Sequence, residues 1–106
     1  MPTVQETFDA MPGKLIKDKA AGITAIYQFD LSGDGGGQWW AEVKDCACCV
    51  SKGLHPSPSI TVRMTAQDYL DMASGKLNGQ LAFMTGRLKL KGDMALAIKM
   101  NTIFSK

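Results

Sequence analysis

The strongest constraint on the fold is a pair of alternating segments joined by glycines, "GITAIYQFDLSGDGGGQWWAEVKD", residues 22–45. Apolar residues occupy every second position in residues 23–31 and again in residues 39–43. A period of two is typical of strands with one buried face, and the glycine-rich connection predicts a β-hairpin. A phosphate-binding Gly-X-Gly-X-X-Gly loop is not matched, because Gln38 stands where that pattern needs glycine.

The rest of the chain predicts further strands and helices. Apolar residues spaced by three and four predict a first helix from Val4 that ends near Pro12 and Gly13. Alternation predicts three more strands, at residues 46–53, 59–64 and 87–92. Helices are expected at residues 65–75 with Thr65 as N-cap, at residues 78–86, and from Met94 onward with Asp93 as cap. We therefore expect one α+β domain, residues 1–106, with a five-stranded, mainly antiparallel sheet covered on one face by helices.

Composition narrows the class of protein. The net charge of +2 is too small to indicate nucleic acid as a partner, and no apolar run is long enough to span a bilayer. The first residues lack the basic segment and apolar run of a secretion signal. Three clustered cysteines do not form a disulfide framework and favour a reducing interior, so we expect a cytoplasmic protein.

The cysteines Cys46, Cys48 and Cys49 are the residues most suggestive of chemistry. With His55, the single histidine, they could supply four zinc ligands on paper. However, consecutive cysteines on a strand point to opposite faces, so Cys48 and Cys49 would not converge on a metal. A disulfide between these two would strain the backbone, and a catalytic Cys–His pair lacks a third group. We expect no metal and no cofactor, with Cys46, Cys48 and Val50 on one face of a strand, where cysteine acts as a small hydrophobe.

The last predicted helix is apolar almost all round. From Met94 to Phe104 only Lys99, Asn101 and Thr102 interrupt the apolar residues, and they form no continuous polar face. Such a helix must bury nearly its whole circumference. Another protein surface, an enclosed apolar ligand, or simple core burial would each satisfy it. Six methionines beyond Met1 suit a surface that repacks around varied apolar ligands, although gap-filling in an ordinary core is the plainer interpretation.

One long segment resembles a known family. "SGKLNGQLAFMTGRLKLKGDMALAIKM", residues 74–100, is similar to the signature half of the sterol carrier protein 2 domain, and the resemblance extends back to about Ile23. The matching residues are Gly75, Lys76, Ala82, Phe83, Gly86, Arg87, Leu88, Lys89, Leu90, Gly92, Asp93, Met94, Leu96, Ala97 and Lys99, with Trp39, Val43 and Lys44 upstream. Asn78 and Gly79 depart from the proline that the family often has there, and the loop "GLHPSPS" is individual to this chain.

The resemblance implies a sheet and helices that enclose an apolar lipid tunnel, with loose selectivity among sterols, fatty acids, fatty acyl-CoA and phospholipids, and no catalysis. No convergent acid–base or nucleophile set is evident in the sequence, which agrees with this implication. We therefore expect a non-catalytic lipid carrier. The residues predicted to bind the ligand are Phe8, Met11, Tyr27, Phe29, Trp39, Phe83, Met84, Met94, Ile98 and Met100.

Two alternatives to a free carrier stay open. The first is an accessory module that presents lipid to a lipid-metabolising enzyme, which would be peroxisomal if a longer chain carried the signal; "FSK" stops one leucine short of it. A free-standing enzyme is the second and has little support. Arg87, Lys89 and Lys91 form a basic stripe that either is a solvated, edge-protecting sheet face or makes transient contact with an anionic membrane surface or acyl-CoA phosphates.

Overall fold

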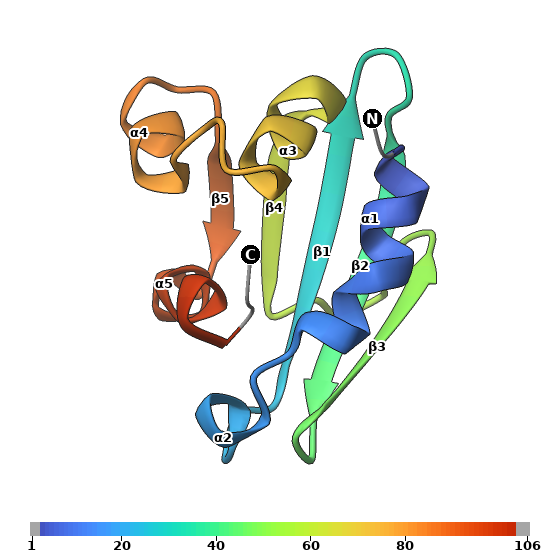
Figure 1. The fold of residues 1–106 in the computed structure, drawn as a ribbon, viewed down its shortest axis with the longest axis vertical. Coiled ribbons are helices and arrows are strands. Elements are labelled where there is room, and N and C mark those ends of the chain that lie inside the picture. Colours follow the sequence, from blue (N-terminus) through green and yellow to red (C-terminus); the bar gives the residue numbers. More distant parts are fainter. Residues whose placement is uncertain (1–2, 104–106) are drawn as a thin grey trace.

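The computed structural model describes residues 3–103 and contains a five-stranded sheet with helices (Figure 1). The chain begins with α1 (Val4–Ala10), the 3-10 turn η1 (Met11–Lys14) and α2 (Lys17–Ala20). Four strands follow, which are β1 (Ala25–Ser32), β2 (Gly37–Lys44), β3 (Ala47–Lys52) and β4 (Ile60–Thr65). The remaining elements are α3 (Ala66–Ala73), α4 (Gly79–Met84), β5 (Lys89–Gly92) and α5 (Met94–Ile103).

The strands are ordered β3-β2-β1-β4-β5 in one sheet. Three neighbouring pairs are antiparallel, and the central pair, β1 with β4, is parallel. This confirms the predicted mainly antiparallel α+β sheet. The parallel pair arises because residues 53–59 carry the chain from the β3 edge back past β2 and β1 before β4 begins.

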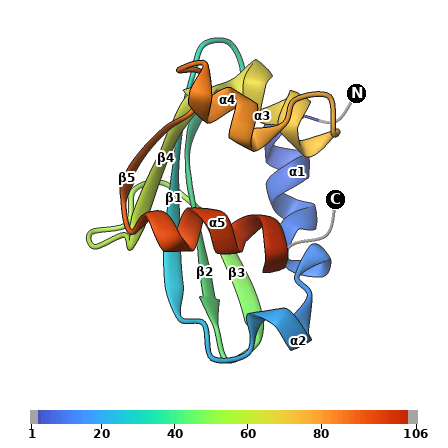
Figure 2. The ribbon, with the colours of Figure 1, turned by 90° about the vertical axis from the view of Figure 1, so that its left-hand side faces the viewer.

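The helices lie on one face of the sheet (Figure 2). The strand residues that face them are buried in the alternating pattern that the sequence predicts, and all but Ile23 of that pattern lie within β1 or β2. These buried residues are Ala25, Tyr27, Phe29 and Leu31 on β1, Trp39, Ala41 and Val43 on β2, and Ile60, Val62 and Met64 on β4. Ile23 precedes β1 and is half-buried.

Side chains at the predicted caps begin three of the helices. The Thr65 hydroxyl accepts the Asp68 backbone N–H at 3.1 Å, and the Asp93 carboxylate accepts that of Ala95 at 3.0 Å. Asn78 accepts from two backbone N–H groups at the start of α4, so this departure from the family pattern supplies an N-cap. The helix starts predicted at residues 65 and 93 are therefore confirmed.

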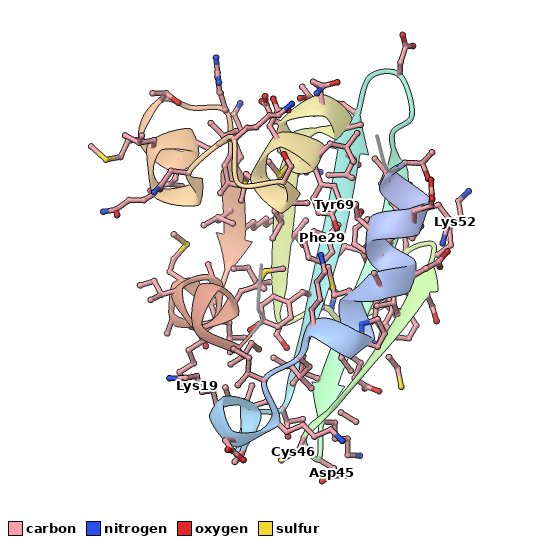
Figure 3. The ribbon with its side chains drawn as sticks, in the orientation of Figure 1. Lys19, Phe29, Asp45, Cys46, Lys52 and Tyr69 are labelled. Atoms are coloured by element: carbon pink, nitrogen blue, oxygen red, sulfur yellow. The ribbon has the colours of Figure 1, made fainter. Side chains whose placement is uncertain are left out.

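The prediction for Cys46 is corrected. Asp45 and Cys46 have φ values of 54° and 60° and form the turn between β2 and β3, at the tip that Figure 3 labels. Two-residue hairpins favour this left-handed conformation because it matches the twist of the flanking strands. The strand therefore begins at Ala47, and Cys46 does not share a strand face with Cys48.

Gln28 is a second difference, because its place in the alternation predicts a solvated side chain and it is buried. Residues 53–59 cross the sheet face opposite the helices and cover it. The Gln28 side-chain amide donates to the carbonyls of Trp39 and Gly53, both at 3.0 Å, and its oxygen accepts the His55 N–H at 2.7 Å. A buried amide with its hydrogen bonds satisfied is tolerated, and here it ties the loop to the sheet.

Candidate functional site

A pocket of about 370 Å³ lies between the sheet and its covering helices. Its wall comes from α1, η1, β1, β4, α3, α4, β5 and α5, together with Leu88 just before β5. The lining residues are Thr7, Met11, Lys14, Phe29, Val62, Met64, Tyr69, Met72, Ala73, Gly79, Phe83, Leu88, Leu90, Met94, Ala97, Ile98 and Met100. The volume and the predominantly apolar wall are typical of a small-molecule site.

The few polar groups in this wall offer little chemistry. The Thr7 hydroxyl donates to the Val4 carbonyl at 2.7 Å, so the 3.2 Å contact with Tyr69 is a bond that the Tyr69 hydroxyl donates. Burial raises the pKa of Tyr69 to about 12. Lys14 is the remaining ionisable side chain in the wall as described. This wall can therefore hold an apolar body, but it brings together no nucleophile with an acid or base.

An aromatic cluster closes one side of the pocket. The Phe8 ring stacks on Trp39 and on Tyr69, with 4.9 Å between centroids in both pairs, and meets Phe29 edge-on at 5.1 Å. Figure 3 shows Phe29 and Tyr69 next to each other between the sheet and the helices. The Trp39 indole N–H donates to Gln5 at 3.0 Å. The cluster holds Phe29 and Tyr69 in place as pocket wall, while Phe8 and Trp39 lie behind them.

The structure brings six of the ten predicted ligand-binding residues into the pocket wall, namely Met11, Phe29, Phe83, Met94, Ile98 and Met100. Phe8 and Trp39 belong to the aromatic cluster behind it. Tyr27 is buried, and its hydroxyl donates to the Leu96 carbonyl at 3.0 Å. Met84, on the outer side of α4, is exposed. Ligand contact by any of the ten stays a prediction.

Sequence reasoning missed much of the wall. Tyr69 and Met72 lie three residues apart on α3, a spacing that signals one helix face, but only the cap and end of that helix had been considered. Val62 and Met64 were expected to face inward, which alternation can show, but not that a pocket rather than packed core would lie against them. Leu90 is the same case on β5.

The cysteines and the histidine lie away from this pocket wall. Cys48 is buried, and this burial raises its thiol pKa to about 11. The His55 ring meets Trp40 edge-on at 5.0 Å, and its Nδ1 accepts the Ser57 N–H at 3.0 Å. Between residues 3 and 103, no three His, Cys, Asp or Glu side chains are grouped as metal ligands would be.

The last helix divides its apolar surface among three environments. Ile103 is buried in the core, Ala97 and Met100 line the pocket, and Ile98 lines the pocket while remaining 72% exposed. Phe104, which the sequence pattern included, lies outside the described residues. Within the described part of the chain, neither this helix nor any other is long and apolar enough to cross a membrane.

Together, the one-sided sheet, its helical cover and the apolar pocket define an α+β domain built to enclose an apolar ligand. The chain belongs to the SCP-2 sterol transfer family, whose model matches residues 8–105. This confirms the family resemblance found in the sequence. The described residues form a pocket, and a longer tunnel stays a prediction.

Relatives place this fold in two contexts. Human hydroxysteroid dehydrogenase-like protein 2 is 41% identical over 97% of this chain, which spans about a quarter (25%) of that protein. The stereoselective inverting sec-alkylsulfatase Pisa1 from Pseudomonas sp. is similar in fold (TM-score 0.83, 23% identity) over 99% of this chain and 17% of its own. Palmitated SCP2L2 from Aedes aegypti (TM-score 0.76, 23% identity) matches 93% of this chain and 91% of its own.

Proposed function

We propose that this chain binds one lipid molecule in the apolar pocket and transfers it without chemical turnover. The observation that carries the proposal is the pocket itself, about 370 Å³ with a wall that is apolar apart from Thr7, Lys14 and the Tyr69 hydroxyl. Burial of a hydrocarbon chain contributes about 0.8 kcal/mol per methylene. Membership of a sterol transfer family and the palmitate on the Aedes aegypti relative support a fatty acyl or sterol ligand.

The methionines support loose selectivity among such ligands. Five of the seven line the pocket, namely Met11, Met64, Met72, Met94 and Met100. An unbranched thioether side chain changes rotamer easily and fills irregular gaps. The wall can therefore repack around lipids of different shape, and the ligand class is set more by hydrophobicity than by directed hydrogen bonds.

A filled-pocket variant tests the proposal against a matched control. Ala97→Trp places an indole into the pocket wall on α5, whereas Ala95→Trp puts the same side chain at an exposed position of the same helix, outside the wall. With a fluorescent fatty acid, we expect saturable binding to the native protein and to Ala95→Trp, and at least tenfold weaker binding to Ala97→Trp. Circular dichroism checks that both variants keep their helices.

Absence of saturable binding to the native protein would sink the proposal, and equal affinity of the two variants would show that the ligand lies elsewhere. Mass spectrometry of lipid that co-purifies with the native protein then identifies the ligand class.

The second candidate function is an accessory module that presents lipid to an enzyme. It is favoured by the lengths of the relatives, because the chain spans 25% of the human dehydrogenase-like protein and 17% of the sec-alkylsulfatase. Coding sequence adjoining this gene discriminates between carrier and module. Cytoplasmic location, with the peroxisome as alternative, stays a prediction.

A further inference from the structure

The mouth of the pocket opens within an exposed apolar surface, which we name the α4–α5 face. It consists of the five large exposed hydrophobic side chains of these two helices, Leu81, Phe83, Met84, Met94 and Ile98. Three of them, Phe83, Met94 and Ile98, also line the pocket. Leu81 is 58% and Met84 72% exposed, and neither lines the pocket. Grouped apolar exposure of this kind marks an interaction site.

Charge is distributed unevenly with respect to this face. Residues 72–106 contain six of the twelve Lys and Arg but only one of the ten carboxylates, Asp93, while residues 1–71 contain the other nine carboxylates. Five exposed cations lie on or beside α4, β5 and α5, namely Lys76, Arg87, Lys89, Lys91 and Lys99. Among the described residues none of these five forms an ion pair, since the recorded pair is Arg63 with Asp30.

The positions of these elements agree with a single docking side. Figure 2 views the molecule from the side on which α4, β5 and α5 lie nearest the viewer, with β5 as the edge strand of the sheet. Lys89 and Lys91 alternate with Leu90, whose side chain lines the pocket, so these two cations project from the opposite face of the sheet and rim the docking side.

We propose that the α4–α5 face docks on an anionic membrane surface and that lipid passes between bilayer and pocket through the mouth it surrounds; the last step rests on the proposed function. The occupant follows from charge complementarity, because an apolar face bordered by cations of one sign matches a leaflet with anionic headgroups. Docked in this way, the pocket mouth meets the bilayer interior, and an apolar ligand enters without crossing water.

The magnitude of the electrostatic part follows from the number of cations. One Lys or Arg near an anionic leaflet contributes a factor of about five in partitioning. Loss of two therefore weakens vesicle binding about 25-fold at low salt, and added salt weakens the native protein in the same direction.

Co-sedimentation with phosphatidylcholine vesicles, with and without phosphatidylserine, tests the proposal. We expect the native protein to bind the phosphatidylserine vesicles and to lose that binding at high salt. The double variant Leu81→Asp/Met84→Asp should lose vesicle binding at least tenfold and keep fatty acid binding in solution. The control Leu54→Asp changes a residue that is 67% exposed on the opposite side of the sheet, in residues 53–59, and should bind vesicles like the native protein.

A second pair of variants isolates charge. Lys76→Gln/Arg87→Gln should weaken vesicle binding, whereas Lys44→Gln/Lys52→Gln, which removes the same charge from β2 and β3, should not. Equal loss in both pairs would mean that only net charge matters and would overturn the docking face. Vesicle binding unaffected by Leu81→Asp/Met84→Asp, or self-association of the native protein that these changes abolish, would overturn it too. Vesicle binding without fatty acid binding would sink the proposed function and leave the docking surface standing.

Discussion

Truncation of Phe8 and of Phe83 to alanine should have opposite consequences, although both were predicted from the sequence to contact the ligand. Phe8 is fully buried in the aromatic cluster behind the pocket. Phe83 lines the pocket at its mouth and is nearly half exposed. Phe8→Ala should therefore reduce the free energy of unfolding, and Phe83→Ala should reduce ligand affinity.

The size of the stability loss follows from the contacts of the Phe8 ring. Truncation of a buried Phe to Ala costs about 3–5 kcal/mol. The Phe8 ring pairs with Trp39 and Tyr69 at 4.9 Å and with Phe29 at 5.1 Å, and each such pair contributes about 0.5–1.5 kcal/mol beyond burial. The loss should therefore lie near the upper end, about 4–5 kcal/mol, against a total of about 5–15 kcal/mol for a domain. Phe83→Ala should cost about 1 kcal/mol or less, because much of its ring is already in water.

Urea unfolding followed by circular dichroism measures both losses, with equal m-values as the check that the unfolded states are comparable. Phe8→Leu, which retains most of the buried volume, gives a folded variant if Phe8→Ala leaves too little stability. Titration with a fluorescent fatty acid measures affinity. The reasoning is refuted if Phe83→Ala destabilises as much as Phe8→Ala, or if folded Phe8→Leu loses ligand binding while Phe83→Ala keeps it.

Three further predictions concern single groups. Cys48 should resist a thiol reagent at pH 8 while the other two cysteines react, since burial raises its pKa to about 11 and the thiolate is the reactive form; labelling of all three in the native protein would contradict this. Burial first of all raises the pKa of Tyr27 and Tyr69 to about 12 from 10, so the stability they contribute is fully present below pH 10 and is lost as pH rises toward 12, which tyrosinate absorbance and alkaline unfolding measure. Thr65→Ala should cost about 1 kcal/mol in urea unfolding, because it removes the cap on the Asp68 N–H, and Thr65→Ser should restore most of it.

The sheet could be predicted because its strands carry their orientation in the sequence. Alternation from residue 25 to 31 and from 39 to 43 is a local property, since a shift of one residue would turn every apolar side chain to the wrong face. Thr65 and Asp93 are local signals as well, because a cap acts on backbone groups two or three residues away. For these elements the local pattern and the tertiary packing agree.

Gln28 and Phe8 were placed less well because their surroundings come from distant segments. Gln28 follows the polar phase of β1, and only the path of residues 53–59 across the sheet buries it. Phe8 has the apolar spacing of a helix face, but its ring contacts Trp39 and Tyr69, which are 31 and 61 positions further along the chain. Facing can be inferred from spacing, whereas the division between packed core and pocket wall depends on how tightly separate elements meet.

The last helix shows why a pattern of nearly continuous apolar residues did not decide among core, ligand and partner surface. Residues from Met94 to Ile103 meet all three, because α5 crosses the end of the helical layer. Ile103 is packed, Ala97 and Met100 face the pocket, and Ile98 faces outward at its mouth. A polar residue at position 98 would suit water, but it would place a desolvation cost beside an apolar ligand at the pocket mouth. An apolar residue there is best accounted for by a surface that is not always in water, which is the state that docking on a bilayer provides.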